Sequence, residues 1–373
     1  PDMAPMIHNE MRKHGIKLVL GYTVEGFKEK DNGVEVLLKD NPSLHADMVV
    51  LAIGVTPDTA LAKEAGLELG IKGSIVVNER METSVPDIYA AGDAVQVKHY
   101  VTGDDTLISL AGPANKQGRI IADNICGGDS RYLGSQGSSV IKVFDMTAAT
   151  TGINETNAKK SGLEVDTVIL SPMSHAGYYP GGKVMTMKVV FKKETYRLLG
   201  AQIIGYEGVD KRIDVLATAI HAGLKATQLK DLDLAYAPPY SSAKDPVNMA
   251  GFMIDNIAKG ILKQWHLEDM DKISKDKSAV LLDVRTVGEF NRGHMDGFKN
   301  IPVDELRERI NEIEKGKPVY LICQSGLRSY IASRILEGNG YETYNFSGGF
   351  RFYDTVVNDR ALIERAYACG MDY

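Results

Sequence analysis

An apolar strand predicted at residues 318–322 leads directly into Cys323, and a helical pattern begins at Leu327. A strand, a short loop and a helix in this order are typical of a compact α/β domain. The thiol of Cys323 lies where unpaired N–H groups at a helix start point, which stabilises a thiolate. Gly326 lets the loop curl and Arg328 adds a positive charge. We therefore predict a nucleophilic cysteine, the alternative being a buried core cysteine at a strand end.

Composition and net charge exclude several kinds of partner and binding site. The 373 residues are 44% apolar and 25% charged, enough for two or three soluble domains. A net charge of −6 gives no broad basic field for nucleic acid or anionic lipid. Because no apolar stretch approaches membrane-spanning length and the start has no leader pattern, we expect a cytoplasmic protein without a membrane partner. The three cysteines, Cys126, Cys323 and Cys369, form no CxxC pair, so no metal site is expected.

Hydrophobic patterning predicts three parts that differ in texture. In the first part we expect strands at 17–20, 34–38, 47–54, 74–78 and 87–94 and a helix at 113–125. The middle part is predicted as α+β, with strands at 140–144, 165–170, 184–191 and 199–204 and helices from Val209 and Ala243. The last part is predicted as α/β, with strands at 279–283, 318–322 and 342–346 and helices at 287–292, 303–314 and 327–338.

The C-terminal motifs resemble the rhodanese family of sulfurtransferases over roughly 260–373. They are 281–285 (LLDVR), 289–290 (EF), 293–294 (GH), 300–302 (NIP), the loop 323–329 and 347–350 (SGGF). The resemblance implies that Cys323 takes up a sulfane sulfur as a persulfide and passes it to a thiol. Related cell-cycle phosphatases have a loop one residue longer, which leaves phosphatase action a minor alternative.

The same resemblance implies roles for residues around Cys323. Arg328 is expected to be catalytic. Asp283 and Arg285 are expected to organise the fold, and His294 to be a structural turn residue. The expected persulfide cradle consists of Gln324, Ser325, Gly326, Leu327 and Ser329.

A glycine and an aspartate close a predicted strand at Gly92-Asp93, where a carboxylate can bond a sugar or ribityl hydroxyl. Together with 110–119 (LAGPANKQGR), the stretch 83–94 resembles the second flavin-contacting region of pyridine nucleotide–disulfide oxidoreductases. The resemblance implies that Gly92, Asp93, Ala94 and Ala111 contact FAD. Alone, Gly92-Asp93 is more often an ordinary turn.

Two tyrosine-containing stretches, 175–181 (HAGYYPG) and 236–246 (YAPPYSSAKDP), resemble coenzyme A–disulfide reductases and their NADH oxidase relatives. In that family such tyrosines belong to the dimerisation domain and reach the partner subunit's flavin and thiol. The resemblance implies this role for Tyr240, at the cofactor, and for one of Tyr178 and Tyr179, at the substrate. The alternative is that they are amphipathic residues at a subunit interface.

Further residues are candidates for contacts with coenzyme A. Asn115 and Asn248 fall where substrate or flavin contacts are expected by resemblance. Coenzyme A also needs cations for its phosphates, and the alternative for each cation is an ordinary solvated surface charge. The candidate cations are Lys116, Arg119, Lys211 and Arg212.

The chain departs from its family in lacking any GxGxxG motif, so both nucleotide fingerprints are expected upstream of Pro1, along with the redox cysteine. Cys126 is not expected to replace it, because a helix C-terminus disfavours a thiolate. The expected fold is α/β: partial FAD/NAD(P)-binding Rossmann-type domains, an α+β dimerisation domain and a C-terminal α/β rhodanese domain. The expected boundaries are 1–54 (tail of the NAD(P)-binding domain), 55–134 (second FAD-binding segment), 135–259 (dimerisation), 260–277 (linker) and 278–373 (rhodanese).

The leading functional hypothesis is a homodimeric, flavin-dependent NAD(P)H reductase of coenzyme A disulfide, persulfide or polysulfide, fused to a rhodanese domain. FAD, NAD(P)H and coenzyme A are the implied cofactors and ligands, and small thiols, disulfides or persulfides the substrates. Two alternatives stay open. One is a dimeric sulfurtransferase without reductase activity, and the other is a sulfur-binding docking module that turns over nothing. The sequence does not distinguish NADH from NADPH, since the residues that read the ribose lie elsewhere.

Overall fold

The computed structural model describes residues 2–30 and 32–368, so Cys369 lies outside the described residues. The chain divides into two compact units. The first contains residues up to Glu10 and 138–357, and the second contains 11–137 and the chain from 358 on. Among the described residues, none of the helices combines the length and apolar character that crossing a membrane requires.

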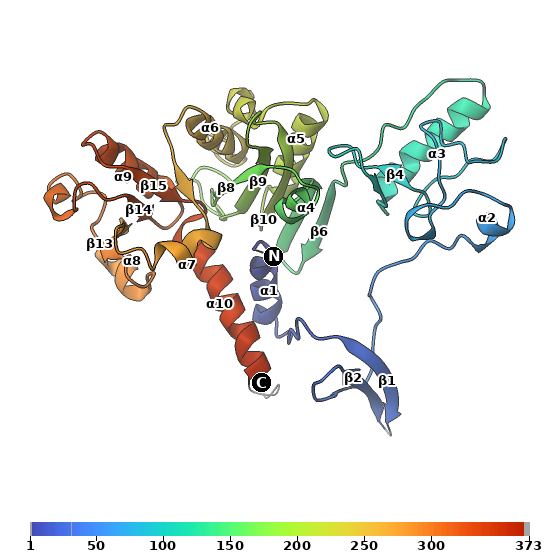
Figure 1. Cartoon of the computed structure of the whole chain (residues 1–373), viewed down its shortest axis with the longest axis horizontal. Helices are drawn as coiled ribbons and strands as arrows, with labels where there is room; N and C mark the ends of the chain where they lie inside the picture. The colour runs from blue at the N-terminus through green and yellow to red at the C-terminus, as the bar shows by residue number, and fades with distance from the viewer. Residues whose placement is uncertain (1, 31, 369–373) are drawn as a thin grey trace. The chain divides into compact units, whose positions relative to one another are not determined.

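The middle of the chain folds into an antiparallel five-stranded sheet in the order β6-β7-β10-β9-β8 (Figure 1). α5 packs on β7 and β10, and α6 packs on β8 and on the 3-10 helix Ala226–Asp231. The four predicted strands and both predicted helices are confirmed. The missed strand is β7, whose Thr, Ala and Gly residues carry little apolar signal. The elements are β6 (Ser139–Val143), β7 (Met146–Gly152), α4 (Glu155–Lys160), β8 (Val165–Leu170), β9 (Thr186–Lys192), β10 (Leu198–Gly205), α5 (Val209–His221) and α6 (Pro246–Ala258).

The C-terminal part of this unit is a parallel five-stranded sheet in the order β11-β15-β14-β12-β13. α9 packs on β14 and β15, at the centre of the sheet. The predicted strands, α8 and α9 are confirmed, whereas the long helix α10 was not predicted. The elements are β11 (Gln264–Trp265), α7 (Met270–Ile273), β12 (Val280–Asp283), α8 (Val287–Arg292), β13 (Lys299–Asn300), β14 (Val319–Ile322), α9 (Leu327–Glu337), β15 (Thr343–Phe346) and α10 (Gly349–Ala368).

Two expectations for this region are wrong. Residues 260–277 are not a linker, because β11 within them pairs with β15. The predicted helix 303–314 is a series of turns with one 3-10 helix, Ile310–Glu312. These turns still bury Leu306 and Ile313, so the apolar spacing that suggested a helix is satisfied by another local structure.

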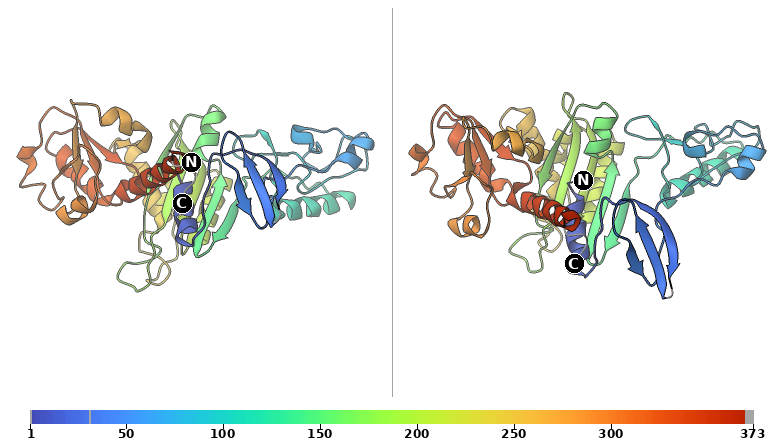
Figure 2. Two further views of the ribbon diagram at one scale, coloured as in Figure 1. Left: turned by 90° about the horizontal axis from the view of Figure 1, so that it is seen from below. Right: turned by 60° about the horizontal axis from the view of Figure 1, so that its bottom comes forward.

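The second unit contains a small antiparallel sheet β1-β2-β3, drawn in blue in Figure 2, and a helix, α3, that confirms the predicted one. The strands predicted at 17–20 and 47–54 are absent, and those at 74–78 and 87–94 are reduced to isolated bridges. A strand buried on both faces needs hydrogen-bonded neighbours on both sides, and no described strand pairs with 47–54. Met48, Val50, Leu51 and Ile53 are therefore exposed, and Val49 is half-buried. The elements in and near this unit are α1 (Ala4–Lys13), β1 (Val24–Lys30), β2 (Gly33–Leu38), β3 (Leu44–Ala46), α2 (Ala60–Glu64), β4 (Val97–Lys98), β5 (Asp105–Thr106) and α3 (Ala111–Ile125).

The two sheets of the first unit share one hydrophobic core. Trp265 packs against Phe346 with ring centroids 4.5 Å apart, and the same cluster contains Ile169 of β8 and Ile204 of β10. The N–H of Ile169 donates to the hydroxyl of Ser347 at 3.0 Å, which joins the edge strand β8 to the residue after β15. The parallel sheet is thus anchored to the antiparallel one through buried contacts.

Truncating Phe346 tests this core. We expect Phe346→Ala to lower the free energy of unfolding by about 3–5 kcal/mol, because the cavity beside Trp265 cannot close fully. Trp265 is the chain's single tryptophan, so its fluorescence reports on this core in urea titrations. Val287→Ala, at a side chain 53% exposed, is the control and should change the free energy by about 0.5 kcal/mol or less. Equal effects of both variants would contradict a shared core at Trp265.

Candidate functional site

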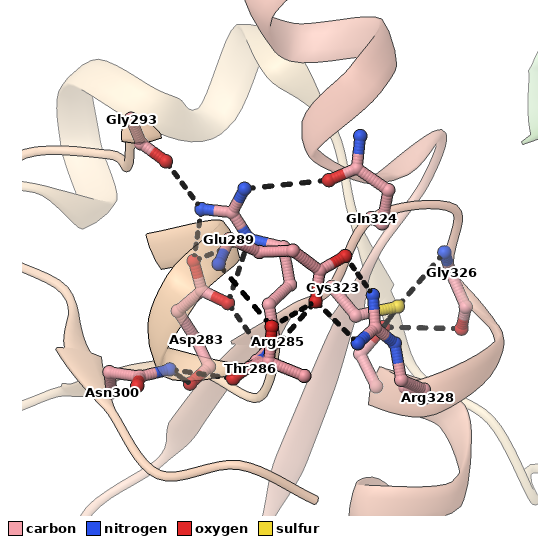
Figure 3. Close-up of polar contacts among 11 residues, drawn as sticks. Asp283, Arg285, Thr286, Glu289, Gly293, Asn300, Cys323, Gln324, Gly326 and Arg328 are labelled. Atoms are coloured by element: carbon pink, nitrogen blue, oxygen red, sulfur yellow. Dashed lines mark hydrogen bonds and ion pairs between the residues drawn. The ribbon is translucent and has the colours of Figure 1, made fainter. Parts of the chain in front are cut away.

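The Cys323 thiol lies at the carboxyl end of β14, where the chain turns into α9 (Figure 3). Its Sγ accepts hydrogen bonds from the N–H of Gly326 at 3.1 Å and from the Ser329 hydroxyl at 3.2 Å. Gly326 has φ +98°, a left-handed conformation that glycine adopts without strain, and it is the N-cap of α9. The thiol therefore faces donors at the start of an eleven-residue helix, and it is also fully buried within a hydrophobic core cluster, so its role as a nucleophile stays a prediction.

The other predicted cradle residues, Gln324, Ser325 and Leu327, make no hydrogen bond to Sγ among those that the structure describes. The N–H groups of Gln324, Ser325 and Leu327 donate to no acceptor in the described part of the chain. Such donors at a helix start are available to an anion. An extra sulfur on Cys323 would therefore meet unpartnered N–H groups as well as those already bonded to Sγ.

The start of α10 holds the Cys323 loop in place through two backbone hydrogen bonds. The N–H of Phe350 donates to the carbonyl oxygen of Cys323 at 2.7 Å, and the N–H of Arg351 donates to that of Gln324 at 3.2 Å. A Cβ on Gly349 would lie 2.7 Å from the Gln324 carbonyl oxygen and from the Ser325 nitrogen, so only glycine fits. The close approach explains the Gly-Gly pair after Ser347.

Asn345, on β15 beneath the loop, is a residue that sequence reasoning missed. Its side chain is 3% exposed, and its Nδ2 donates to the carbonyl oxygen of Gly326 at 3.3 Å. Its Oδ1 has no hydrogen-bond partner among the described residues. No motif marked this residue, because an asparagine in a strand gives no signal until β15 is seen to pair beside β14.

Asp283 and Arg285 form a buried ion pair beside the loop, as expected for residues that organise the fold. Arg285 Nη2 donates to Asp283 Oδ2 at 2.6 Å, and both side chains are at most 2% exposed. Arg285 also donates to the Gly293 carbonyl oxygen at 2.7 Å and to the Gln324 side chain at 3.4 Å. His294 is exposed and stacks on Phe290, in agreement with a structural role.

Arg328 makes a two-point ion pair that the sequence did not predict. Its Nη1 and Nη2 each donate to one carboxylate oxygen of Glu289 at 2.7 Å. These hydrogen bonds, followed by those from Thr286, lower the pKa of Glu289 to about 2. Glu289 therefore stays ionised at neutral pH, and the charge of Arg328 is balanced within the site.

The tyrosines lie on exposed loops of the dimerisation part. The hydroxyls of Tyr178 and Tyr236 are 2.8 Å apart, and this hydrogen bond raises the pKa of Tyr236. Tyr236 was quoted in a motif but given no role. Tyr179 packs edge-on against His175 with centroids 5.6 Å apart, while Tyr240 is 71% exposed. Of the candidate tyrosines, Tyr178 is the one whose hydroxyl is paired with another phenol.

Arg212 differs from both readings of the sequence, since it is neither a phosphate ligand nor a surface charge. Its side chain is 2% exposed and donates to Asp245 Oδ2 at 3.0 Å and to the Ser241 hydroxyl at 3.1 Å. It also donates to the carbonyl oxygen of Tyr240 at 3.2 Å. This network fixes the loop 236–245 beside a cavity of about 440 Å³ that Tyr236 and Tyr240 line.

The remaining candidates lie on α3 in one unit and on α5 and α6 in the other. Asn248 is buried, and its amide donates to the carbonyl oxygens of Leu229 and Leu232, so it links α6 to the segment before it. Asn115 is exposed on α3, with its amide donating to Ala111. Lys116 and Arg119 are exposed on the same helix, and the Lys211 ammonium donates to the Ala235 carbonyl oxygen at 3.4 Å.

The two stretches assigned to flavin contacts come together in the second unit. Gly92 has φ +89°, its N–H donates to the Gln117 side chain at 2.7 Å, and a Cβ there would lie 3.9 Å from that of Ala114. Asp93 and Ala111 are exposed, and Ala94 is half-buried. Gly92 thus lies against the first turns of α3. Cys126 is the exposed C-cap of that helix, as predicted.

Comparison with known protein families agrees with this architecture. Residues 1–118 match the pyridine nucleotide-disulphide oxidoreductase model, 138–246 match the dimerisation domain of the same family, and 266–354 match the rhodanese-like domain. The chain therefore belongs to the pyridine nucleotide-disulphide oxidoreductases and carries a rhodanese-like domain toward its C-terminus. This family uses flavin and NAD(P)H.

Several known proteins are similar to this chain. A solved structure of reduced Bacillus anthracis CoADR-RHD has 46% identity and a TM-score of 0.92, covering 96% of this chain and 64% of that one. A NAD-dependent persulfide reductase from A. fulgidus has 40% identity and a TM-score of 0.86, covering 94% and 64%. An NAD(P)H sulfur oxidoreductase (CoA-dependent) of Pyrococcus abyssi is 37% identical over 246 residues, 66% of this chain and 54% of that protein. The chain spans about half the length of the curated relatives it matches.

Breaking the buried pair beside the loop tests its structural role. We expect Asp283→Asn to lower the free energy of unfolding by about 3–5 kcal/mol, because Arg285 would be left as an unpaired buried charge. Urea titration measures the change. Glu312→Gln breaks an exposed ion pair with Arg309 and is the control, with an expected cost of about 1 kcal/mol or less. A cost for Asp283→Asn as small as that of the control would contradict the role given to the pair.

The low pKa of Glu289 predicts a defined pH dependence. The folded-state pKa of about 2 lies below the ordinary value of 4.5, so the pair stabilises the fold above pH 4.5, and this contribution is lost as the pH falls toward 2. The difference in unfolding free energy between the wild type and Glu289→Gln should therefore be constant near neutral pH and shrink below pH 4.5. Urea titrations across this range measure it. A difference that stays constant in acid would show that Glu289 is not held ionised.

Proposed function

We propose that this chain is part of a flavin-dependent NAD(P)H reductase of coenzyme A disulfide, persulfide or polysulfide, and that Cys323 carries sulfane sulfur as a persulfide. One observation carries the second half of this proposal. Sγ of Cys323 accepts donors from Gly326 and Ser329, and neighbouring N–H groups have no acceptor in the described part of the chain. This arrangement can hold a terminal sulfur anion.

The transfer needs no oxidant or reductant. The Cys323 thiolate attacks the outer sulfur of a donor, the sulfur–sulfur bond of the donor breaks, and the donor's remaining sulfur leaves with the electron pair. The Cys323 persulfide then loses its outer sulfur to an acceptor thiolate in the same way. Gly326 and Ser329 orient Sγ in both steps, and the free N–H groups stabilise the negative charge on the outer sulfur.

The residues present fit one part of a flavin site. Gly92 admits close backbone approach, Asp93 offers an exposed carboxylate, and the start of α3 beside them carries no side-chain cap at Leu110. When bound, a flavin supplies the electron pair that NAD(P)H delivers. The assigned roles of Gly92, Asp93, Ala94 and Ala111, and the domain boundaries given above apart from the linker at 260–277, remain part of this proposal.

The Tyr178–Tyr236 hydroxyl pair is the better candidate for a substrate contact than Tyr240 or Tyr179, because it presents two coupled O–H groups at an exposed surface. A phenol of such a pair can donate to a departing thiolate while the other restores the hydrogen bond. Together with the match to the dimerisation domain, this supports a homodimer in which the pair serves the partner subunit. Coenzyme A as the thiol is supported by the CoA-dependent relative.

The intact mass of the purified chain tests the sulfur-carrier role. After incubation with a sulfane-sulfur donor, the wild type should gain about 32 Da, one sulfur atom, and dithiothreitol should remove it. Cys323→Ser should gain nothing, and Cys126→Ser, which removes an exposed cysteine elsewhere, should behave as the wild type.

No gain by a folded wild type whose Cys323 is still alkylated would contradict the carrier role and favour a docking module. A mass gain that is lost in Cys126→Ser would show that Cys126, and not Cys323, takes up the sulfur. For the reductase role, Cys323→Ser in the longer parent protein should slow turnover of sulfane-sulfur donors. Unchanged turnover of every donor would separate the two activities and favour a sulfurtransferase that acts independently.

A further inference from the structure

The positive charge of Arg328, which follows the Cys323 loop in sequence, is paired with the carboxylate of Glu289. Both outer nitrogens of its guanidinium donate to Glu289, each at 2.7 Å, in the parallel geometry that gives the strongest carboxylate–arginine pairs. The pKa of Arg328 is raised, first by its hydrogen bonds to Glu289 and further by the charge of Cys323, so the guanidinium and the thiol interact electrostatically. The side chains are 31% and 21% exposed, so the pair is reachable from solvent.

Glu289 is held in this position by its own helix. It is the third residue of α8 in a capping box, where Thr286 donates to Glu289 Oε2 through its N–H at 3.0 Å and its hydroxyl at 2.9 Å. The carboxylate therefore accepts four hydrogen bonds from fixed donors. Breaking its contact with Arg328 would leave the carboxylate without its counter-ion, so the four hydrogen bonds favour the paired state.

The second arginine at the loop is neutralised in the same way. Arg285 is paired with the buried Asp283 and reaches the loop only through the Gln324 side chain. Each of the two arginines drawn in Figure 3 is thus paired with a carboxylate, Arg328 with Glu289 and Arg285 with Asp283. What faces the reacting sulfur is a set of neutral N–H and O–H donors, which suits an anion of low charge.

We propose that Glu289 selects the sulfur donor of Cys323, favouring singly charged organic persulfides over the dianion thiosulfate. This inference rests on the proposed sulfur-carrier function. Both donors transfer the same outer sulfur to the Cys323 thiolate, and they differ in the group that leaves, a thiolate from a persulfide and sulfite from thiosulfate. The sulfite dianion develops near Arg328, whose charge Glu289 has already balanced, so Arg328 stabilises this leaving group less than an unpaired arginine would.

The experiment compares two donors on the full chain. The rate of Cys323 persulfide formation is measured by intact mass with thiosulfate and with cysteine persulfide, and the ratio of the two rate constants is the readout. In Glu289→Gln the capping-box geometry is retained while Arg328 is released from its counter-ion. We expect the rate constant with thiosulfate, divided by that with the persulfide, to rise about tenfold, because one positive charge is freed near the protein surface.

Two further variants make the result specific to Arg328. Glu312→Gln removes the same charge from the exposed pair with Arg309 and should leave the ratio unchanged. The double variant Glu289→Gln/Arg328→Met should return the ratio to the wild-type value, because no cation is released. The thiosulfate rate of Glu289→Gln should also fall more steeply with added salt than that of the wild type, which a purely structural role of Glu289 would not cause.

The possible failures are distinguishable. If the wild type forms a persulfide with either donor but the ratio is the same in Glu289→Gln, donor selection by Glu289 is overturned and the carrier role stands. If the wild type forms none with either donor, the carrier role itself fails, and this inference with it. If Glu312→Gln shifts the ratio as much as Glu289→Gln, the effect comes from net charge and the assignment to Glu289 is again overturned.

Discussion

The buried ion pair between Asp283 and Arg285 joins the elements around the Cys323 loop. Asp283 ends β12, and Arg285 reaches from it to the Gly293 carbonyl oxygen after α8, to Gln324 in the loop and to the ring of Phe350, 3.8 Å from its guanidinium. A buried charge must keep its partners or cost several kcal/mol. The pair therefore fixes the distance between β12, α8, the loop and α10, and the thiol is positioned by that frame.

Hydrogen bonds made by α10 and by the segment before it add to this frame. Phe350 binds the backbone of Cys323 from α10, and Ser347, two residues before Gly349, accepts the N–H of Ile169 from the antiparallel sheet. Trp265 fills the core between the two sheets. The segment after β15 thus contacts both the antiparallel sheet, through Ser347, and the backbone of Cys323, through Phe350.

Local patterns carried much of the prediction. The strand before Cys323, the helix at Leu327 and the glycine between them follow from neighbouring residues, and the structure contains all three. The expectations that failed depend on distant partners. The apolar run 47–54 lacks strands to pair with among the described residues, and residues 264–265 form a strand only because β15 lies beside them.

The sequence by itself determined the family and the strand, loop and helix that hold Cys323, because these depend on short spacings along the chain. Only the tertiary structure decided which charges meet. The pairing of Arg328 with Glu289, of Arg212 with Asp245 and of Tyr178 with Tyr236 joins residues at least 33 positions apart. Such contacts are set by how strands and loops are brought together in space, and spacing along the chain does not encode that.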